Sequence, residues 1–563
     1  AARSRRAGLR TITMVQNDAF FKMRFNTESR AIRLALTCIL LFPLVSESQS
    51  VSKVWVADNG DGTYRNPIIH ADYSDPDVIR VGDDYYMTAS SFNCIPGLPI
   101  LHSRDLVNWT IIGYALKRQP PFDLFARPQH GGGVWAPAIR FHNGEFYIYY
   151  ADPDRGIYMT KAKDPRGDWS EPLLIKEAKG WIDPCPLWDD DGQAYLVSAM
   201  AASRSGIKSV LIVSRMSPDG TKLLDDGVIV FDGHDRNPTV EGPKFYKRNG
   251  YYYIFAPAGG VETGWQLVLR ARNVYGPYEV RTVLAQGRTS VNGPHQGGWV
   301  ETQTGESWFI HFQDKGAYGR VVHLQPMVWR DDWPVIGSDP DGDGTGEPVL
   351  IYRKPNVGRT YPIATPPDSD EFDAPRLGLQ WQWHANPQPN WAFPSSLGFL
   401  RLFNVPAPEG SKNLWQLPNL LLQKFPAPRF TVTTKLTFTP RADGERIGLI
   451  VMGTDYAYIA VEKRPDGLYV LQATCRGADQ QAPEERTSAI KLTERTFYLR
   501  VEVAEGARCI FSYSADGARF SPLGEAFMAK PGRWIGAKVG LFATGPGTAR
   551  EFGYADVDWF RVE

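Results

Sequence analysis

Residues 73–87, YSDPDVIRVGDDYYM, contain a glycine-centred turn at Gly82 followed by an aromatic strand. The same pattern returns four times further along the chain, at Gly144, Gly192, Gly250 and Gly305, with spacings of 62, 48, 58 and 55 residues. Asn-Gly and Asp-Gly pairs supply the positive φ of a hairpin turn, and Tyr, Phe and Ile are typical of the strand that follows. A strand-rich repeat of roughly fifty residues predicts the blades of a five-bladed β-propeller.

One residue seven to ten positions before each of these glycines carries the chemistry of the repeat. In chain order these residues are Asp75, Trp135, Asp183, Glu241 and His295. Because the first strand of each propeller blade lines the central axis, equivalent positions converge on one end of the channel. The repeat therefore predicts a pocket with three carboxylates, an aromatic platform and a histidine. That combination suits acid–base hydrolysis of a glycosidic bond.

A second region of short alternating strands begins near residue 370. Val432, Thr434, Leu436 and Phe438 alternate with Thr and Lys residues, and a similar alternation recurs over residues 499–503. About ten such strands with almost no helical periodicity predict a β-sandwich. We therefore predict an all-β protein, with a propeller over residues 51–352, a proline-rich linker over 353–369 and a sandwich over 370–563.

Residues 1–50 have the pattern of an upstream segment followed by a secretory signal peptide. Basic residues around Arg24 and Arg30 precede a short apolar run from Leu34 to Val45, and polar residues follow it. The run is too short to span a bilayer. We therefore expect a secreted or periplasmic protein without a membrane span.

Composition excludes a nucleic-acid partner. The chain carries 62 basic and 62 acidic residues, and the part beyond residue 50 has a net charge of −5 without a basic patch. Aromatic residues make up 12% of the chain, which suits both a β-rich core and the stacking of sugar rings. The cysteines beyond residue 50 show no metal-binding spacing, so we expect mostly free, buried thiols.

The motifs in these blades resemble glycoside hydrolase family 43. They include Ser74-Asp75-Pro76-Asp77, Trp135-Ala136-Pro137, Asp183-Pro184 and Glu241-Gly242-Pro243, each in its own blade and in the family's order. The resemblance runs from about Tyr64 to Trp333. A further resemblance, from about Asp370 onward, is to the concanavalin-A-like sandwich that follows the propeller in the β-xylosidase branch.

The resemblance implies a role for each candidate residue. Asp75 corresponds to the general base and Glu241 to the general acid of an inverting glycosidase, whose carboxyls lie about 6.5–9.5 Å apart to admit a water molecule. Asp183 corresponds to the acid that orients the general acid and raises its pKa. Trp135 and Phe92 correspond to walls of the sugar subsite.

Arg320 and His295 correspond to two further family positions. The arginine hydrogen-bonds sugar hydroxyls and balances the acids, although Val321 and Val322 follow it here in place of an acidic–polar pair. The histidine lies under the active site and contacts a hydrated calcium ion or an ordered water on the axis. We expect no cofactor to be required, apart from such a structural Ca²⁺.

The resemblance favours β-1,4-xylosidase action on the non-reducing ends of xylo-oligosaccharides. The close alternative is an α-L-arabinofuranosidase acting on arabinose-substituted hemicellulose, either alone or as a second activity of a bifunctional enzyme. An endo-acting arabinanase is more distant, because an appended sandwich tends to block one end of the cleft. A non-catalytic sugar-binding propeller is the alternative outside enzymes, and the presence of all three acids argues against it. The sequence leaves the oligomeric state open.

Overall fold

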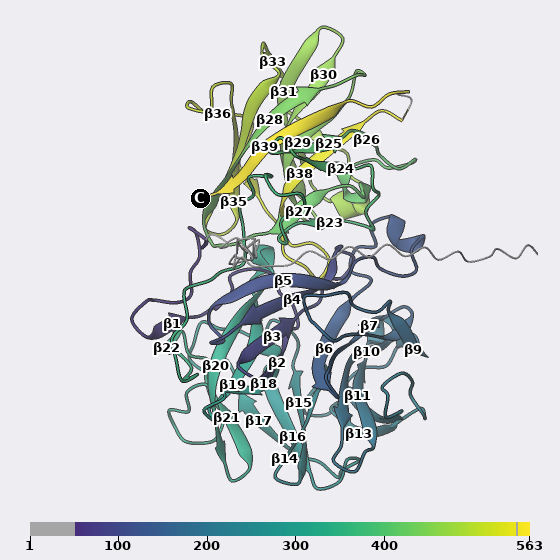
Figure 1. The fold of residues 1–563 in the computed structure, drawn as a ribbon, viewed down its shortest axis with the longest axis vertical. Coiled ribbons are helices and arrows are strands. Elements are labelled where there is room, and N and C mark those ends of the chain that lie inside the picture. Colours follow the sequence, from purple (N-terminus) through teal and green to yellow (C-terminus); the bar gives the residue numbers. More distant parts are fainter. Residues whose placement is uncertain (1–50, 548–549) are drawn as a thin grey trace, which may run out of the picture. The chain divides into compact units, whose positions relative to one another are not determined.

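The computed structural model describes residues 51–547 and 550–563, and their secondary structure is almost entirely β. The predicted signal peptide lies in residues 1–50, outside the described residues, and stays a prediction. Five four-stranded sheets are followed by two larger sheets, which Figure 1 shows in blue to teal and in green to yellow, respectively. The predicted fold, a five-bladed propeller followed by a β-sandwich, is confirmed.

Each propeller blade is an antiparallel sheet of four strands that pair in chain order. The first two blades contain β2 (Asp77–Val81), β3 (Asp84–Thr88), β4 (Gly97–Ser103), β5 (Trp109–Leu116), β6 (Trp135–His142), β7 (Glu145–Asp152), β8 (Gly156–Ala162) and β9 (Leu173–Glu177). The other three contain β10 (Trp181–Trp188), β11 (Ala194–Met200), β12 (Val210–Met216), β13 (Val228–Asp232), β14 (Lys244–Arg248), β15 (Tyr251–Ala258), β16 (Trp265–Ala271), β17 (Glu279–Leu284), β18 (His295–Glu301), β19 (Ser307–Asp314), β20 (Arg320–Arg330) and β21 (Trp333–Ile336).

The repeated glycine turns join the first and second strands of the five blades, as the sequence predicted. All five glycines have φ between 64° and 87°, a region that only glycine adopts without strain. Three of the innermost strands also contain a register shift near their first residues: β6 between Trp135 and Ala138, β10 between Ile182 and Cys185, and β18 between His295 and Gly297. A bulge redirects side chains, so these shifts help to aim the candidate residues at the end of the axis.

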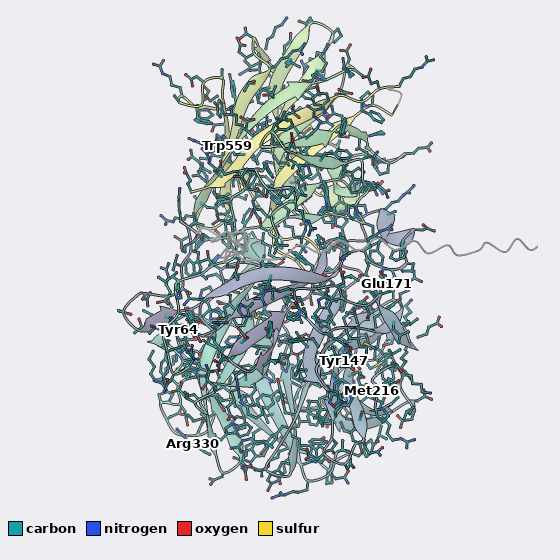
Figure 2. All side chains as sticks on the ribbon, viewed as in Figure 1. Tyr64, Tyr147, Glu171, Met216, Arg330 and Trp559 are labelled. Atoms are coloured by element: carbon teal, nitrogen blue, oxygen red, sulfur yellow. The ribbon has the colours of Figure 1, made fainter. Side chains whose placement is uncertain are left out.

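The ring of blades closes where the fifth blade meets the first. Arg80 of β2 donates a hydrogen bond to the carbonyl of Glu301 in β18, at 2.7 Å. A short sheet of β1 (Thr63–Arg65) and β22 (Ile351–Arg353) lies beside this junction. The hydroxyl of Tyr64, labelled in Figure 2, donates to the carbonyl of Leu324 in β20 at 2.8 Å. The start and end of the propeller sequence are thereby held together.

The sandwich buries one apolar core between its two sheets, which includes Trp381, Leu436, Val461 and Phe560. One sheet contains β23 (Gln382–Trp383), β26 (Val405–Pro406), β27 (Leu421–Lys424), β29 (Arg446–Met452), β30 (Tyr456–Arg464), β31 (Gly467–Cys475), β32 (Glu485–Arg486), β33 (Ile490–Leu492) and β38 (Lys538–Gly545). The other contains β24 (Ala392–Ser395), β25 (Phe399–Phe403), β28 (Phe430–Thr439), β34 (Thr496–Ala504), β35 (Arg508–Ser514), β36 (Ser521–Pro522), β37 (Phe527–Met528) and β39 (Tyr554–Val562).

The described residues contain little helix. They form α1 (Ala202–Ser205) and single 3-10 turns at Leu124–Ala126, Gly316–Tyr318, Leu414–Gln416 and Ala478–Gln480. None of these helices has the length and apolar character needed to cross a membrane. Cys94, Cys185, Cys475 and Cys509 are buried and unpaired, which confirms the expectation of free thiols.

Candidate active site

A cavity of about 90 Å³ lies at the end of the propeller where the predicted residues converge. Since one water occupies roughly 10–15 Å³ of such space, the cavity admits several waters or part of a small ring-shaped molecule. Its walls include six of the seven residues that the sequence singled out, namely Asp75, Phe92, Trp135, Asp183, Glu241 and Arg320. The seventh, His295, contacts Glu241 from a fully buried position. Residues far apart in the sequence therefore form one site.

Asp75 lies at the start of the first blade in a left-handed backbone conformation, with φ of 56°. Its Oδ2 accepts hydrogen bonds from the hydroxyls of Ser74, at 2.7 Å, and Ser90, at 2.6 Å. Its Oδ1 lies 3.4 Å from a guanidinium nitrogen of Arg320. Two hydroxyl groups thus hold Oδ2 of this carboxyl. Oδ1 lies beside the Arg320 guanidinium and accepts no hydrogen bond from either serine.

Glu241 is the most exposed of the three acids. Its Oε1 lies 2.9 Å from Nε2 of His295, and its side chain keeps 23% of its surface accessible. The next residue, Gly242, has φ of 57°, and a Cβ there would lie 2.5 Å from the side chain of Gln296. Glycine at 242 is therefore required for this close approach, which holds the Glu241 backbone against the fifth blade.

Asp183 repeats the backbone conformation of Asp75, with the same φ of 56°, but has other partners. Its Oδ2 accepts a hydrogen bond of 2.8 Å from the backbone N–H of Gly242. Burial, followed by the charges of Glu241 and Asp75, raises the pKa of Asp183 well above its usual range. The three carboxyls are thus electrostatically coupled, and Asp183 is also tied to the chain next to Glu241.

Aromatic side chains from both domains form the apolar walls of the cavity. Phe92 meets Trp135 edge to face, with ring centroids 6.5 Å apart. Trp534, from a loop of the sandwich, meets Trp135 in the same manner at 6.0 Å. From the sequence we expected an appended sandwich to block one end of the cleft. Trp534 is the residue of the sandwich that lines the cavity. No repeat or motif marks it in the sequence.

Contacts with the propeller fix the loop that carries Trp534. Asp72 accepts a hydrogen bond from the backbone N–H of Gly536 at 3.0 Å and one from the backbone N–H of Arg320 at 2.9 Å. The N–H of Ala537 donates to the carbonyl of Ala317 at 2.7 Å. One carboxylate therefore anchors both the strand that carries Arg320 and the loop that carries Trp534.

Three more residues that line the cavity were not predicted from the sequence, namely Ile182, Val261 and Gln296. Gln296 follows His295 and has φ of 38°. Its buried Oε1 has no hydrogen-bond partner among the described residues. Its place directly after the fifth-blade residue was the one available signal.

Two buried cationic side chains, Arg140 and Lys244, lie on innermost strands of the propeller, β6 and β14. Arg140 of β6 donates to Asp77 at 2.7 Å and to the sulfur of Cys185 at 2.8 Å. Lys244, fully buried, donates to the carbonyl of Pro137 at 3.1 Å. These cations offset part of the negative charge at the end of the axis, and Lys244 acts to lower the pKa of Asp183 against the larger effect of burial.

The predicted calcium contact of His295 finds no direct coordination site. In the described part of the chain, the one group of three candidate ligands with converging atoms is Asp339, Asp341 and Asp343, on a surface loop. Calcium prefers six to eight oxygen ligands, whereas His295 offers one free nitrogen, Nδ1, which has no partner among the described residues. The residues around His295 therefore do not fit a directly bound calcium ion, and contact through water stays a prediction.

Comparison with known proteins agrees with this geometry. The family model "Glycosyl hydrolases family 43" matches residues 64–334, and "Beta xylosidase C-terminal Concanavalin A-like domain" matches residues 369–563. A putative β-xylosidase of Xylanibacter ruminicola is 43% identical over 499 residues, which are 88% of each chain.

The chain belongs to glycoside hydrolase family 43. It is therefore a glycosidase, and its partner is a carbohydrate.

Two further family members are similar over most of their length. The non-reducing end α-L-arabinofuranosidase BoGH43B of Bacteroides ovatus is 28% identical over 557 residues, covering 93% of this chain and 98% of that protein. The crystal structure of a xylan β-1,4-xylosidase from Bacillus halodurans has a TM-score of 0.78 and 27% identity, covering 89% of this chain and 99% of that one. The family 43 architecture thus extends over both domains.

Proposed function

We propose that this enzyme is an inverting β-xylosidase that removes terminal D-xylose from β-1,4-linked xylo-oligosaccharides. The observation that carries the proposal is a single small cavity lined by Asp75, Asp183 and Glu241 and walled by aromatic rings. The 43% identical relative, named a putative β-xylosidase, supports the choice of sugar.

Asp75 is the proposed general base. Because Ser74 and Ser90 both donate to Oδ2, Oδ1 is the atom available to take a proton from water. The nearby Arg320 guanidinium can donate a hydrogen bond to a sugar hydroxyl. The water then attacks the anomeric carbon from the face that Asp75 occupies.

Glu241 is the proposed general acid. An Nε2–H of His295 would donate to Oε1, which leaves Oε2 to carry the proton for the departing sugar oxygen. Asp183 positions Glu241 through the N–H of Gly242. Burial, followed by the charges of the other two carboxyls, raises the pKa of Asp183, which favours its protonated form.

The aromatic walls define the proposed subsite. Trp135 and Phe92 present ring faces and edges to the apolar side of one sugar. Trp534 narrows the cavity from the sandwich, which favours the end of a chain over its middle. We therefore propose exo action, one terminal sugar at a time.

An α-L-arabinofuranosidase remains the second candidate. Its support is the α-L-arabinofuranosidase of Bacteroides ovatus, which is 28% identical and covers 93% of this chain. D-Xylopyranose and L-arabinofuranose present similar hydroxyl geometry, so one cavity can take both. We propose arabinofuranosidase action as a secondary activity of the same residues.

The test is hydrolysis of 4-nitrophenyl β-D-xylopyranoside beside 4-nitrophenyl α-L-arabinofuranoside, with the first-formed anomer identified by NMR. We expect faster release from the xyloside, and α-D-xylose as the first product. β-D-Xylose as the first product would contradict inversion. Release of arabinose alone would exchange the two candidate activities without changing the proposed residue roles.

A further inference from the structure

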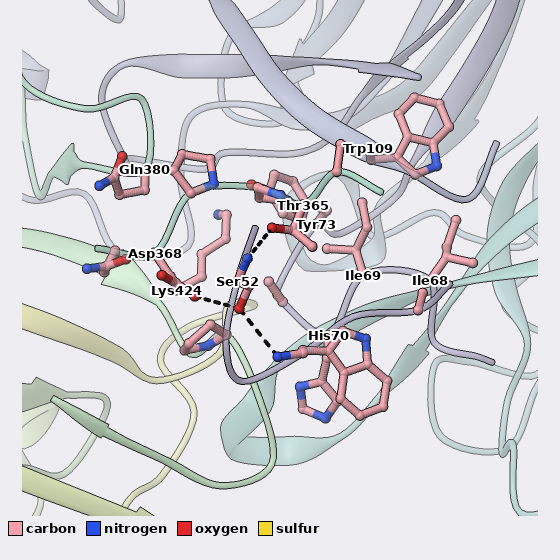
Figure 3. Close-up of a pocket in the computed structure, with 18 of the residues that line it drawn as sticks. Ser52, Ile68, Ile69, His70, Tyr73, Trp109, Thr365, Asp368, Gln380 and Lys424 are labelled. Carbon is pink, nitrogen blue, oxygen red and sulfur yellow. Dashed lines mark hydrogen bonds between the residues drawn. The ribbon is translucent and has the colours of Figure 1, made fainter. Parts of the chain in front are cut away.

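A second cavity, of about 50 Å³, lies between the propeller and the sandwich (Figure 3). Its floor comes from the propeller and includes His70 and Tyr73, and its opposite side includes Gln423 and Lys424 of β27. Ser52 holds the segment that contains Thr365 and Asp368 along one side of the cavity. Its N–H donates to the Thr365 hydroxyl at 2.8 Å, and its own hydroxyl donates to the Asp368 carboxyl at 2.6 Å. We call this space the seam cavity. None of its lining residues lines the catalytic cavity.

Several buried polar atoms around the seam cavity lack partners. His70 is 2% exposed, and neither ring nitrogen forms a hydrogen bond with another residue that the structure describes. Among residues 51–547 and 550–563, Nε2 of Gln423 and Oε1 of Gln380 are also unpartnered, although both side chains are buried. Buried polar groups are usually hydrogen-bonded, and unsatisfied ones require an explanation. Because His70, Gln380 and Gln423 all line this space, a small ligand with hydroxyl groups offers the donors and acceptors that such atoms lack.

The electrostatics of the seam cavity favour an uncharged ligand. Burial lowers the pKa of His70 to about 4, so the ring is neutral at ordinary pH and offers one donor and one acceptor. Burial and the neighbouring Lys538 lower the pKa of Lys424 to about 8, while burial raises the pKa of Asp368. Both shifts favour the uncharged forms of these two side chains, the amine of Lys424 and the protonated carboxyl of Asp368. The cavity therefore favours neither an anionic nor a cationic ligand strongly.

The remaining walls are aromatic. Trp55, Tyr73, Trp109 and Tyr114 line the cavity, and the ring of Trp55 lies 5.1 Å from that of His70. Aromatic surface beside a few donors and acceptors is the chemistry that contacts C–H faces and hydroxyl groups together. From this set of residues and the volume of about 50 Å³, we propose that the seam cavity binds an uncharged polyol smaller than a sugar ring, such as glycerol.

Binding there has a consequence for stability. Because the walls come from both domains, the site exists only while propeller and sandwich are packed together. A ligand that binds the folded state alone raises the unfolding temperature. Catalysis does not require the site, since Asp75, Asp183 and Glu241 have their partners elsewhere.

The experiment is calorimetric titration of the whole enzyme with glycerol, together with a crystal structure in the same polyol. His70→Phe keeps the ring contacts with Trp55 and Tyr318 but removes both nitrogens, and Gln423→Leu removes the unpartnered amide. His384→Phe is the matched control, because His384 is a buried histidine that does not line the seam cavity. Normal hydrolysis of the aryl xyloside would show that each variant is folded.

We expect wild type and His384→Phe to bind one glycerol molecule per chain in the seam cavity. The two seam variants should lose that molecule and the thermal stabilisation that it provides. Glycerol in the catalytic cavity alone, binding at crystal concentration only, or acetate bound in the seam cavity instead of glycerol would each overturn the proposal. Seam binding without xyloside hydrolysis would overturn the proposed function and leave this inference standing.

Discussion

Asp75 and Asp183 occupy equivalent places in the first and third blades. Each precedes a proline, each is nearly inaccessible, and each has φ of 56°. Their partners nevertheless differ. Asp75 has two hydroxyl donors and a guanidinium nitrogen within 3.4 Å, whereas Asp183 has one backbone N–H and faces two other carboxyls.

This difference shows how one repeated backbone produces two kinds of acid. The blade determines where the carboxyl lies, and the side chains packed against it determine its environment: Ser74 and Ser90 of the first blade and Arg320 of the fifth surround Asp75. Burial, followed by the charges of the other acids, raises the pKa of Asp183. Four substitutions and one pH series test how far this contrast extends.

Asp75→Ala should have the largest effect. Loss of the proposed base removes an interaction made in the transition state, so kcat should fall by roughly 10³-fold or more. Steady-state kinetics on the aryl xyloside would measure it, with an unchanged melting temperature as the control for folding. Near-normal turnover would assign the base to another residue.

Asp183→Asn should lower kcat less, by about 10²-fold, because it disturbs the position of Glu241 and leaves the base intact. The asparagine oxygen can still accept from Gly242, so the loop should persist. The pH–rate profile distinguishes a positioning role of Asp183 from an electrostatic one. If Asp183 acts electrostatically, replacing its carboxyl by an uncharged amide should shift the alkaline limb of the profile. A decrease in kcat with an unchanged profile would leave Asp183 a positioning role alone.

Asp183 should also make wild-type stability depend on pH. Its folded pKa is raised by burial, so the folded state binds more protons than the unfolded state between about pH 4 and the folded pKa, and stability falls as pH rises through that range. Asp183→Asn lacks this penalty. Above the folded pKa, the free energy of unfolding of the variant should exceed that of wild type by about 1.4 kcal/mol for each unit between the folded and unfolded pKa of Asp183. Denaturant unfolding from pH 4 to pH 8 measures it, and a constant difference between the proteins would contradict the assignment.

Trp534→Ala removes an aromatic ring that packs against Trp135 and under the Arg320 guanidinium. We expect KM to rise about fivefold to tenfold through lost ring contact, with a smaller change in kcat. Trp534→Phe should recover most of the binding. A loss confined to kcat would show that the sandwich acts on the chemistry and not on the position of the sugar.

Ser90→Ala should have the smallest effect, because it removes one of the two hydroxyl groups that donate to Asp75 and leaves Ser74 in place. A loss of about 1 kcal/mol of transition-state stabilisation corresponds to roughly a fivefold decrease in kcat/KM. Ser91→Ala, whose hydroxyl bonds to the backbone of Leu98, is the matched control. A Ser90 effect as large as that of Asp75→Ala would mean that the hydroxyl acts directly on substrate.

Much of the site could be predicted because the repeat spaces its residues evenly. Glycine turns mark each blade, and counting back from them identified Asp75, Trp135, Asp183, Glu241 and His295 before any coordinates. Trp534 and Gln296 were not predicted, because neither occupies the repeated position of a blade. The structure also gives His295 a partner that the sequence did not identify, the Glu241 carboxyl.

The sequence by itself determined the two β domains, their order and the residues at the end of the axis, because turn chemistry and strand alternation are local properties of the chain. The tertiary structure alone decided which donors surround each acid, why the pKa of Asp183 is raised, and how Asp72 brings Trp534 to the cavity. It also decided that His70 and Gln423 face one space between the domains. These properties depend on burial and on distances between segments far apart in the chain, and no local pattern records either of them.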